Sequence, residues 1–234
     1  MSRSGAMTTT ANRKAAPRAL ILGGLPGSGK SMWMPKLAPP GATVLDPRRI
    51  RDELPRDGYA RPGVAACRLY LDALDGCVRA RADVALETRM TWRGLPRAVE
   101  RLVESGYTVQ VVCLALASPA LAARRVVLRV PHRPPEEDAA SVERAFARAS
   151  CGIAAFPRGL PHAFALIDNS GVRPRVLEER ASPGVAGILP VPFLLQNLRL
   201  AVGEALEYRA SRGWNAAFAA DDGSVRETPA GAVE

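Results

Sequence analysis

One stretch of the sequence combines glycines, a lysine and a serine at a spacing that suits phosphate chemistry. Residues 24–31 read GLPGSGKS, which fits the pattern G-x-x-x-x-G-K-S, and the apolar residues 19–22 precede them. Glycines allow successive backbone N–H groups to turn toward a diphosphate, and a helix that starts there adds its positive end. We expect Lys30 to contact the β- and γ-phosphates and Ser31 to ligate Mg²⁺. The predicted nucleotide site consists of Gly24, Gly27, Ser28, Gly29, Lys30 and Ser31.

Two acidic residues each end a short apolar segment. Asp46 follows residues 42–45 and precedes Pro47, which is a standard helix start with Asp as the N-cap. A carboxylate at the carboxyl end of a strand would also face the phosphate loop, and the two roles are compatible. Glu87 ends residues 83–87, and a carboxylate is costly against a core. It should therefore face a cleft, a metal or an arginine; a surface glutamate is the alternative.

Short apolar segments alternate with amphipathic ones along most of the chain. Strands are expected at residues 19–22, 42–45, 83–87, 107–115 and 164–167, with helices between them. Pro35 should shorten or kink the helix that follows the phosphate loop. The strand at 107–115 ends without an acid, so it offers no Walker-B aspartate. The alternation predicts an α/β fold, a P-loop NTPase with a five-stranded parallel sheet flanked by helices.

The ends of the chain differ in composition from its centre. Residues 1–17 are small, polar and basic and are expected to form a disordered tail before a domain at 18–180. Residues 181–212 form a connector and an added helix at 193–212, whose apolar stripe is Leu194, Leu198, Val202 and Leu206. Residues 213–234 are expected to be a flexible tail. The sequence therefore predicts one folded domain with a C-terminal helix.

Composition narrows the class of protein. The 234 residues are 47% hydrophobic and 24% charged, which is typical of a globular protein, and the formal net charge is +9. No apolar run has membrane-spanning length and no signal peptide is evident, so we expect a cytoplasmic protein without membrane partners. The four cysteines lack C-x-x-C pairing and are expected to be reduced core thiols. No run of four basic residues exists, so nucleic acid is not the expected partner.

Several segments occur together in the order and spacing of a known family. GLPGSGKS, VLD, LETRMTWRGLPRAVERL, ESGYTVQVVCLALASPALAARRVVLRV and LIDNSG resemble the zeta-toxin-like P-loop kinases over residues 18–180. The resemblance implies the strand order of nucleoside monophosphate kinases, with the loop strand central. It also implies ATP as phosphoryl donor with Mg²⁺, and a UDP-activated amino sugar as acceptor. The macromolecular partner that the resemblance implies is an antitoxin protein.

The same resemblance assigns roles to individual residues. Lys30 and Ser31 match the Walker lysine and the Mg²⁺ ligand, and Asp46 resembles the aspartate that accepts the proton of the substrate hydroxyl. The remaining matches are Glu87 and Thr88 at the substrate side, Arg125 and Arg129 as catalytic lid arginines, and Arg144 and Arg148 as the later, nucleotide-binding arginine cluster.

Two departures from the family bear on activity. Arg48 stands where many relatives place an acid, and the turn after the arginine helix is reduced to Val130-Pro131-His132, which indicates a shorter, stiffer lid. His132 is expected to be a solvated loop residue. The sequence predicts an ATP-dependent kinase of a small-molecule hydroxyl. The alternatives are a kinase of a nucleotide, a polynucleotide 5′-hydroxyl or an antibiotic, and a nucleotide-binding switch without catalysis.

Overall fold

A central six-stranded sheet organises the protein. The computed structural model describes residues 15–55, 58–128, 138–183, 189–220, 222 and 224–233. The strands are β1 (Arg18–Gly24), β2 (Thr43–Leu45), β3 (Val84–Glu87), β4 (Thr108–Ala115), β5 (Ala163–Asp168) and β6 (Arg175–Ala181). Their order is β2-β3-β1-β4-β5-β6, with the first five parallel. The loop strand β1 is therefore flanked by β3 and β4, as the resemblance implies.

The strand β6 corrects the expected count of five. It pairs antiparallel with β5, and most of its residues are exposed because it forms one edge of the sheet. Its sequence, RVLEERA, lacks the apolar run that marks the buried strands. An edge strand of this kind carries too little hydrophobic signal to be identified from composition.

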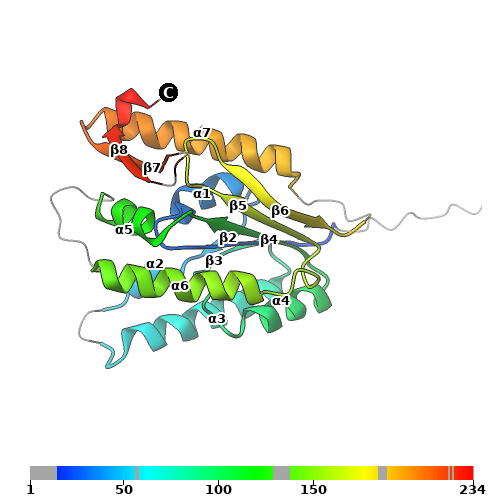
Figure 1. The fold of residues 1–234 in the computed structure, drawn as a ribbon. Coiled ribbons are helices and arrows are strands. Elements are labelled where there is room, and N and C mark those ends of the chain that lie inside the picture. Colours follow the sequence, from blue (N-terminus) through cyan, green and yellow to red (C-terminus); the bar gives the residue numbers. More distant parts are fainter. Residues whose placement is uncertain are drawn as a thin grey trace, which may run out of the picture.

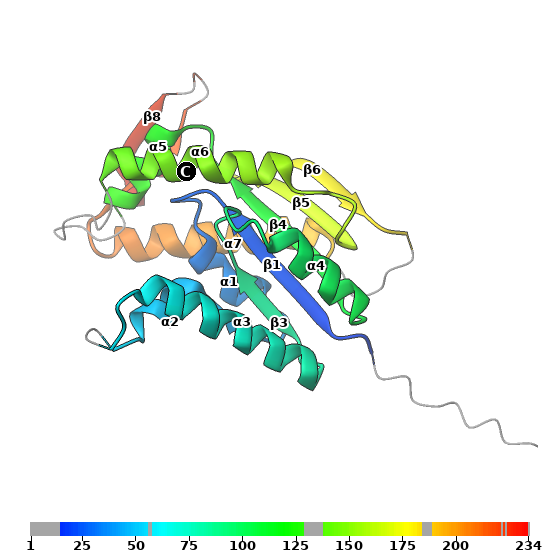
Figure 2. The same ribbon diagram turned by 90° about the horizontal axis from the view of Figure 1, so that it is seen from below.

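Helices cover both faces of the sheet (Figure 1). They are α1 (Lys30–Leu37), α2 (Pro47–Asp52), α3 (Pro62–Ala80), α4 (Leu95–Glu104), α5 (Pro119–Val127), α6 (Ala139–Ala155) and α7 (Val191–Ala210). Figure 2 shows α3, α4 and α6 lying across one face, whereas α1 and α7 lie behind the sheet. Among the described residues, no helix combines the length and apolar character needed to span a membrane. The Pro35-containing helix α1 has eight residues, in line with the expected shortening.

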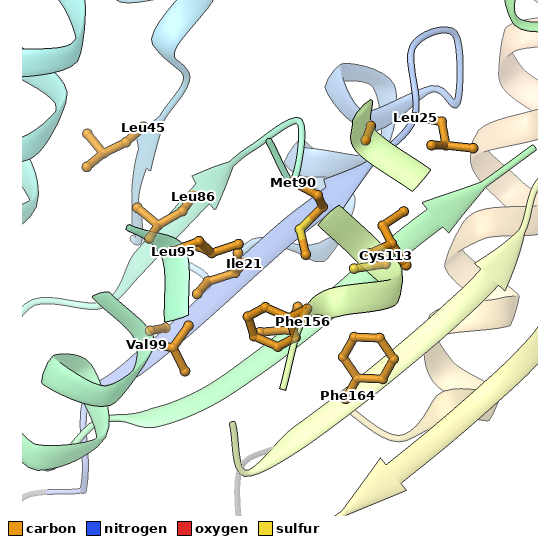
Figure 3. Packing of buried hydrophobic residues seen from close by; sticks show 14 of the residues in the cluster. Ile21, Leu25, Leu45, Leu86, Met90, Leu95, Val99, Cys113, Phe156 and Phe164 are labelled. Carbon is orange, nitrogen blue, oxygen red and sulfur yellow. The ribbon is translucent and has the colours of Figure 1, made fainter. Parts of the chain in front are cut away.

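Alternate side chains of β1 enter two separate cores. Ala19 and Ile21 pack with α3, α4 and α6, while Leu20 and Leu22 pack with α1 and α7. This division follows from the period of two along a strand that is covered on both faces. Figure 3 shows the first core, where Ile21 lies near Leu86 and Leu95. Both layers together fix the position of β1 and hence of the phosphate loop.

The C-terminal part of the chain is more structured than expected. The stripe of α7 packs on the sheet, with Leu194 and Leu198 fully buried. Beyond Gly213, where a flexible tail was expected, β7 (Asn215–Ala219) and β8 (Val225–Pro229) form an antiparallel hairpin, followed by a 3-10 turn (Ala230–Ala232). Burial of Ala217 in the first core and contacts with α5 explain why these small residues adopt a fixed structure.

The cysteines are only partly core residues. Cys77 and Cys113 are buried, as expected, whereas Cys67 and Cys151 are exposed. The latter two lie on α3 and α6, at positions that face away from the sheet. All four are free thiols in the structure.

Candidate active site

The phosphate loop leaves β1 through three glycines with positive φ angles. Gly24, Gly27 and Gly29 have φ values of 145°, 69° and 91°, which side-chain-bearing residues rarely adopt. Packing imposes a second requirement, because a Cβ atom on Gly24 would lie 2.4 Å from Leu114 O. Ser28 closes the loop by donating its N–H and its hydroxyl to Leu25 O, at 3.2 and 2.7 Å. The predicted strand–loop–helix geometry is confirmed.

Lys30 is a buried cation at the centre of the loop. Its side chain is 7% exposed, and Nζ donates to Gly24 O at 3.0 Å and Leu25 O at 2.9 Å. Burial lowers the pKa of Lys30 from 10.5 to about 8, against the opposing charge of Glu87. An anionic phosphate beside the ammonium group would raise that pKa again. The ammonium group thus lies within the loop for which the motif predicts a phosphate contact.

Glu87 lies beside the phosphate loop, at the end of β3. Leu22 of β1 is its partner across the parallel ladder, which brings the carboxylate next to the start of α1. The Ser31 hydroxyl donates to Glu87 Oε1 at 3.3 Å. Burial raises the pKa of Glu87, the nearby charge of Asp46 adds to this effect, and Lys30 opposes it. The structure thus gives Glu87 a contact with the predicted metal ligand itself.

The pair Ser31–Glu87 fits a magnesium site by the chemistry of its donors. A hydroxyl and a carboxylate are hard oxygen ligands, and Mg²⁺ at phosphate sites commonly uses only one or two protein oxygens. The described residues contain no cluster of three or more acidic, histidine or cysteine side chains suited to a metal. The two oxygens at 3.3 Å are therefore the candidate ligands.

Asp46 caps α2 at the carboxyl end of β2. Its Oδ1 accepts the backbone N–H of Arg48 at 2.8 Å, which confirms the N-cap interpretation. The charge of Asp46 raises the pKa of both Lys30 and Glu87, so the carboxylate also lies in the field of the phosphate loop. The adjacent order β2-β3-β1 explains this convergence of Asp46 and Glu87.

A strained turn follows Glu87. Met90 has a φ angle of 60°, and its N–H donates to the Thr88 hydroxyl at 3.2 Å. A Cβ on Gly152 of α6 would lie 1.8 Å from Met90 O, and one on Gly23 would lie 2.4 Å from Met90 Sδ. Packing therefore maintains a conformation that costs about 1 kcal/mol. Thr88, expected at the substrate side, stabilises this turn through its hydroxyl.

Arg125 has contacts other than those expected of a lid arginine. Nε donates to Ala217 O at 2.9 Å, Nη1 to Asn169 O at 2.7 Å and Nη2 to Ser170 O at 2.9 Å. Its guanidinium also lies 5.7 Å from the centre of the Phe218 ring. Burial lowers the pKa of Arg125 to about 10, while the charge of Asp168 opposes that shift. Among the described residues, its hydrogen-bond acceptors are three carbonyl groups of the protein itself.

Two of the remaining predicted arginines lie on α6. Arg144 and Arg148 are exposed on this helix, and Arg144 Nη2 donates to Ser141 Oγ at 2.9 Å. The described contacts do not join either residue to the phosphate loop. Arg129 and His132 lie outside the described residues.

Asn169 is a residue of the site that the sequence interpretation missed. Its Nδ2 donates to Ser28 O at 2.9 Å, a buried contact between residues 141 positions apart. Its Oδ1 is buried and has no partner among the described residues. The segment LIDNSG contributed to the family resemblance, but no local pattern singled out the amide.

The glycine-rich loop between a central parallel strand and α1 defines the P-loop class, and the strand order is the one that the family resemblance implies. The chain is similar in fold to a chain of the PezAT chromosomal toxin–antitoxin system of Streptococcus pneumoniae. That match has 14% identity and a TM-score of 0.52, and covers 82% of this chain and 88% of the other.

A second similar structure is that of AvrRxo1-ORF1:-ORF2 with ATP. The matched chain has 16% identity and a TM-score of 0.53, with 82% of this chain and 77% of that chain covered. No protein-family model and no curated protein matches the sequence. At these identities the likeness shows the fold alone, and this fold agrees with the P-loop fold expected from the sequence.

Proposed function

We propose that the protein is an ATP-dependent kinase that transfers the γ-phosphoryl group to a hydroxyl of a small molecule. The observation that carries this proposal is the glycine-rich loop around the buried ammonium group of Lys30, beside which Ser31 contacts the carboxylate of Glu87. Phosphoryl transfer requires mainly positioning and charge neutralisation. A phosphate-binding lysine with a nearby carboxylate supplies both.

The reaction assigns a separate task to each residue. Asp46 accepts the proton of the acceptor hydroxyl while the new oxygen–phosphorus bond forms and the bond to the β–γ bridging oxygen breaks, releasing ADP. Lys30 contacts the β- and γ-phosphates, and the loop N–H groups bind the phosphate oxygens. The arginines Arg129, Arg144 and Arg148 are proposed to contact the nucleotide from the lid side.

Ser31 and Glu87 are the proposed holders of Mg²⁺, because their oxygens already meet at the mouth of the loop. Magnesium, when bound, supplies positive charge to the phosphate oxygens. Glu87 was expected at the substrate side from the family resemblance. Its contact with Ser31 instead favours a role as a metal ligand. Asp46 then remains the carboxylate that is proposed to contact the acceptor hydroxyl.

A UDP-activated amino sugar is the first acceptor to test. Such a molecule brings a diphosphate, which suits a protein of net charge +9 with 29 arginines among its 32 basic residues, since Lys14, Lys30 and Lys36 are the only lysines. The fold likeness to a chain of PezAT, a toxin–antitoxin system, also supports an antitoxin protein as a partner. Binding to such a partner belongs to the proposal and would be tested by co-purification with a candidate antitoxin.

The deciding experiment is an acceptor panel with labelled ATP and Mg²⁺. The panel contains UDP-amino sugars, nucleotides, an aminoglycoside and a 5′-hydroxyl oligonucleotide. We expect a labelled product with a UDP-sugar that disappears in the Lys30→Ala variant. Efficient labelling of the oligonucleotide alone would instead identify a polynucleotide kinase. Transfer to no acceptor, with ATP still bound, would contradict the kinase proposal.

A nucleotide-binding switch without catalysis is the second candidate. Arg48 favours it, because this residue stands where many members of the resembled family carry an acid, and because its positive charge contributes to the lowered pKa of Lys30. A switch would bind ATP and ADP but form no phosphorylated product. Binding measured by calorimetry, together with the acceptor panel, separates these two functions.

A further inference from the structure

The C-terminal hairpin reaches the phosphate loop through a continuous set of contacts. The hairpin β7–β8 packs beside α5, and Ala219 N donates to Ser170 O at 3.1 Å. Arg124 of α5 forms an ion pair with Glu227 of β8. These contacts tie residues 215–229 to the turn that follows β5. The hairpin is thus part of the structure around the site.

The side chain of Arg125 also connects the hairpin with the turn that follows β5. Its guanidinium donates to the hairpin carbonyl of Ala217 and to both carbonyls of the Asn169–Ser170 turn. A planar guanidinium with fixed donor directions can join three carbonyl groups at once, whereas a lysine ammonium on a flexible stem cannot reproduce that geometry. Arg125 therefore adds three side-chain hydrogen bonds to the backbone bond from Ala219 N that already joins the hairpin to the turn.

The Asn169–Ser170 turn also contacts the phosphate loop. Asn169 Nδ2 donates to Ser28 O at 2.9 Å, and both groups are buried. Ser28 is also the residue whose N–H and hydroxyl close the loop on Leu25. A displacement of the turn would therefore act on the carbonyl of Ser28, next to Gly29 and Lys30.

We infer that Arg125 is a positioning residue of the nucleotide site: it joins the C-terminal hairpin to the Asn169–Ser170 turn, and Asn169 holds the phosphate loop in its nucleotide-binding shape. This inference rests on the proposed nucleotide site but on neither the acceptor nor the catalytic step. It assigns the region from 215 to 229 a role in binding ATP, although the hairpin follows the last strand of the sheet by more than thirty residues.

The test compares Arg125→Lys with a matched control, Arg158→Lys. Arg158 is a second arginine that donates to three carbonyls, those of Ile153, Ala154 and Phe156, and it lies 4.8 Å from the Phe164 ring. It follows the C-terminal end of α6, forms an ion pair with Glu178 of β6 and belongs to no part of the proposed site. Both variants keep the positive charge and should lower the thermal midpoint.

Only the Arg125 variant should change the affinity for ATP. We expect the Kd of ATP, measured by calorimetry without acceptor, to rise about tenfold in Arg125→Lys and less than about twofold in Arg158→Lys. The KM for ATP should rise with the Kd, while kcat at saturating ATP stays within about twofold. Equal Kd values in wild type and Arg125→Lys would overturn the inference and leave the nucleotide site intact.

A second variant, Asn169→Ala, tests whether the effect of Arg125 reaches the phosphate loop through Asn169. It should weaken ATP binding about as much as Arg125→Lys, and the double variant should be no weaker than either single one, because both changes interrupt one path. Additive losses would overturn the route through Asn169. Failure of the wild-type protein to bind ATP would overturn this inference and the proposed function together.

Discussion

The hydroxyl of Ser31 lies 3.3 Å from Oε1 of Glu87, so the first turn of α1 and the end of β3 meet at the phosphate loop. The two residues are 56 positions apart, and the parallel pairing of β1 with β3 brings them together. Strands β3 and β4 flank β1 on opposite sides. The end of β3 carries an acidic residue, Glu87, whereas the end of β4 carries none. This relationship gives the first prediction.

Glu87→Gln should impair the use of Mg²⁺ more than the binding of ATP. The amide keeps the size of the side chain but removes the charge that would balance a divalent cation. We expect the Mg²⁺ concentration for half-maximal activity to rise at least about tenfold, with the Kd of metal-free ATP near the wild-type value. Glu204→Gln, an exposed change on α7, serves as control. If only the KM of the acceptor increased, Glu87 would be assigned to acceptor binding and not to the metal.

Asp46→Asn separates the capping role from the catalytic one. Asn caps a helix about as well as Asp, so the thermal midpoint should change little. If Asp46 accepts the proton of the acceptor hydroxyl, kcat should fall by about 10² or more, because the amide cannot take that proton. Measuring kcat and the midpoint on the same preparation tests both roles. A stable variant with unchanged kcat would leave Asp46 only as the cap of α2.

The affinity for ATP should fall at alkaline pH because of Lys30. The pKa of Lys30 is about 8 in the free protein, below its usual 10.5, and bound phosphate should raise it again. Binding then takes up a proton above pH 8, so affinity is fully present below that value and declines as pH rises. Linkage gives a loss of about eightfold between about pH 7.5 and about pH 9. In Lys30→Met, calorimetry should show weaker binding without this decline.

The local elements of the site could be predicted from the sequence, because their signals are local. The phosphate loop, the Asp46 cap and the acidic end of β3 each depend on residues that are neighbours in the chain. Apolar runs likewise identified the five parallel strands, since such strands are buried on both faces. The resemblance supplied the strand order, which no local pattern contains.

The contacts that brace the site could not be predicted in this way. Asn169 and Ser28 are 141 positions apart, and Arg125 and Ala217 are 92 apart, so no spacing in the sequence relates them. An arginine near a phosphate loop suggests a phosphate contact. The guanidinium of Arg125 instead donates hydrogen bonds to the carbonyls of Asn169, Ser170 and Ala217. The hairpin was missed because small, weakly apolar residues become strands here only through burial against α5.

Helix α7 provides the last prediction, which concerns stability. The sequence predicted that its apolar stripe packs on the core or on a partner chain, and the structure places the stripe on the sheet beside Trp33 and Met34 of α1. Leu198 is fully buried in this layer. Leu198→Ala removes its contacts and leaves a cavity, so the free energy of unfolding should fall by about 3 kcal/mol.

Leu200→Ala on the same helix is the matched control, because Leu200 is 56% exposed and its truncation opens no cavity. Its cost should be below about 0.5 kcal/mol. Urea unfolding followed by far-UV circular dichroism measures both variants, with an unchanged slope confirming that the same surface unfolds. Because α1 carries Lys30 and Ser31 at its start, loosening this layer should also weaken ATP binding in Leu198→Ala. Equal stabilities of the two variants would show that α7 does not depend on its buried stripe for packing.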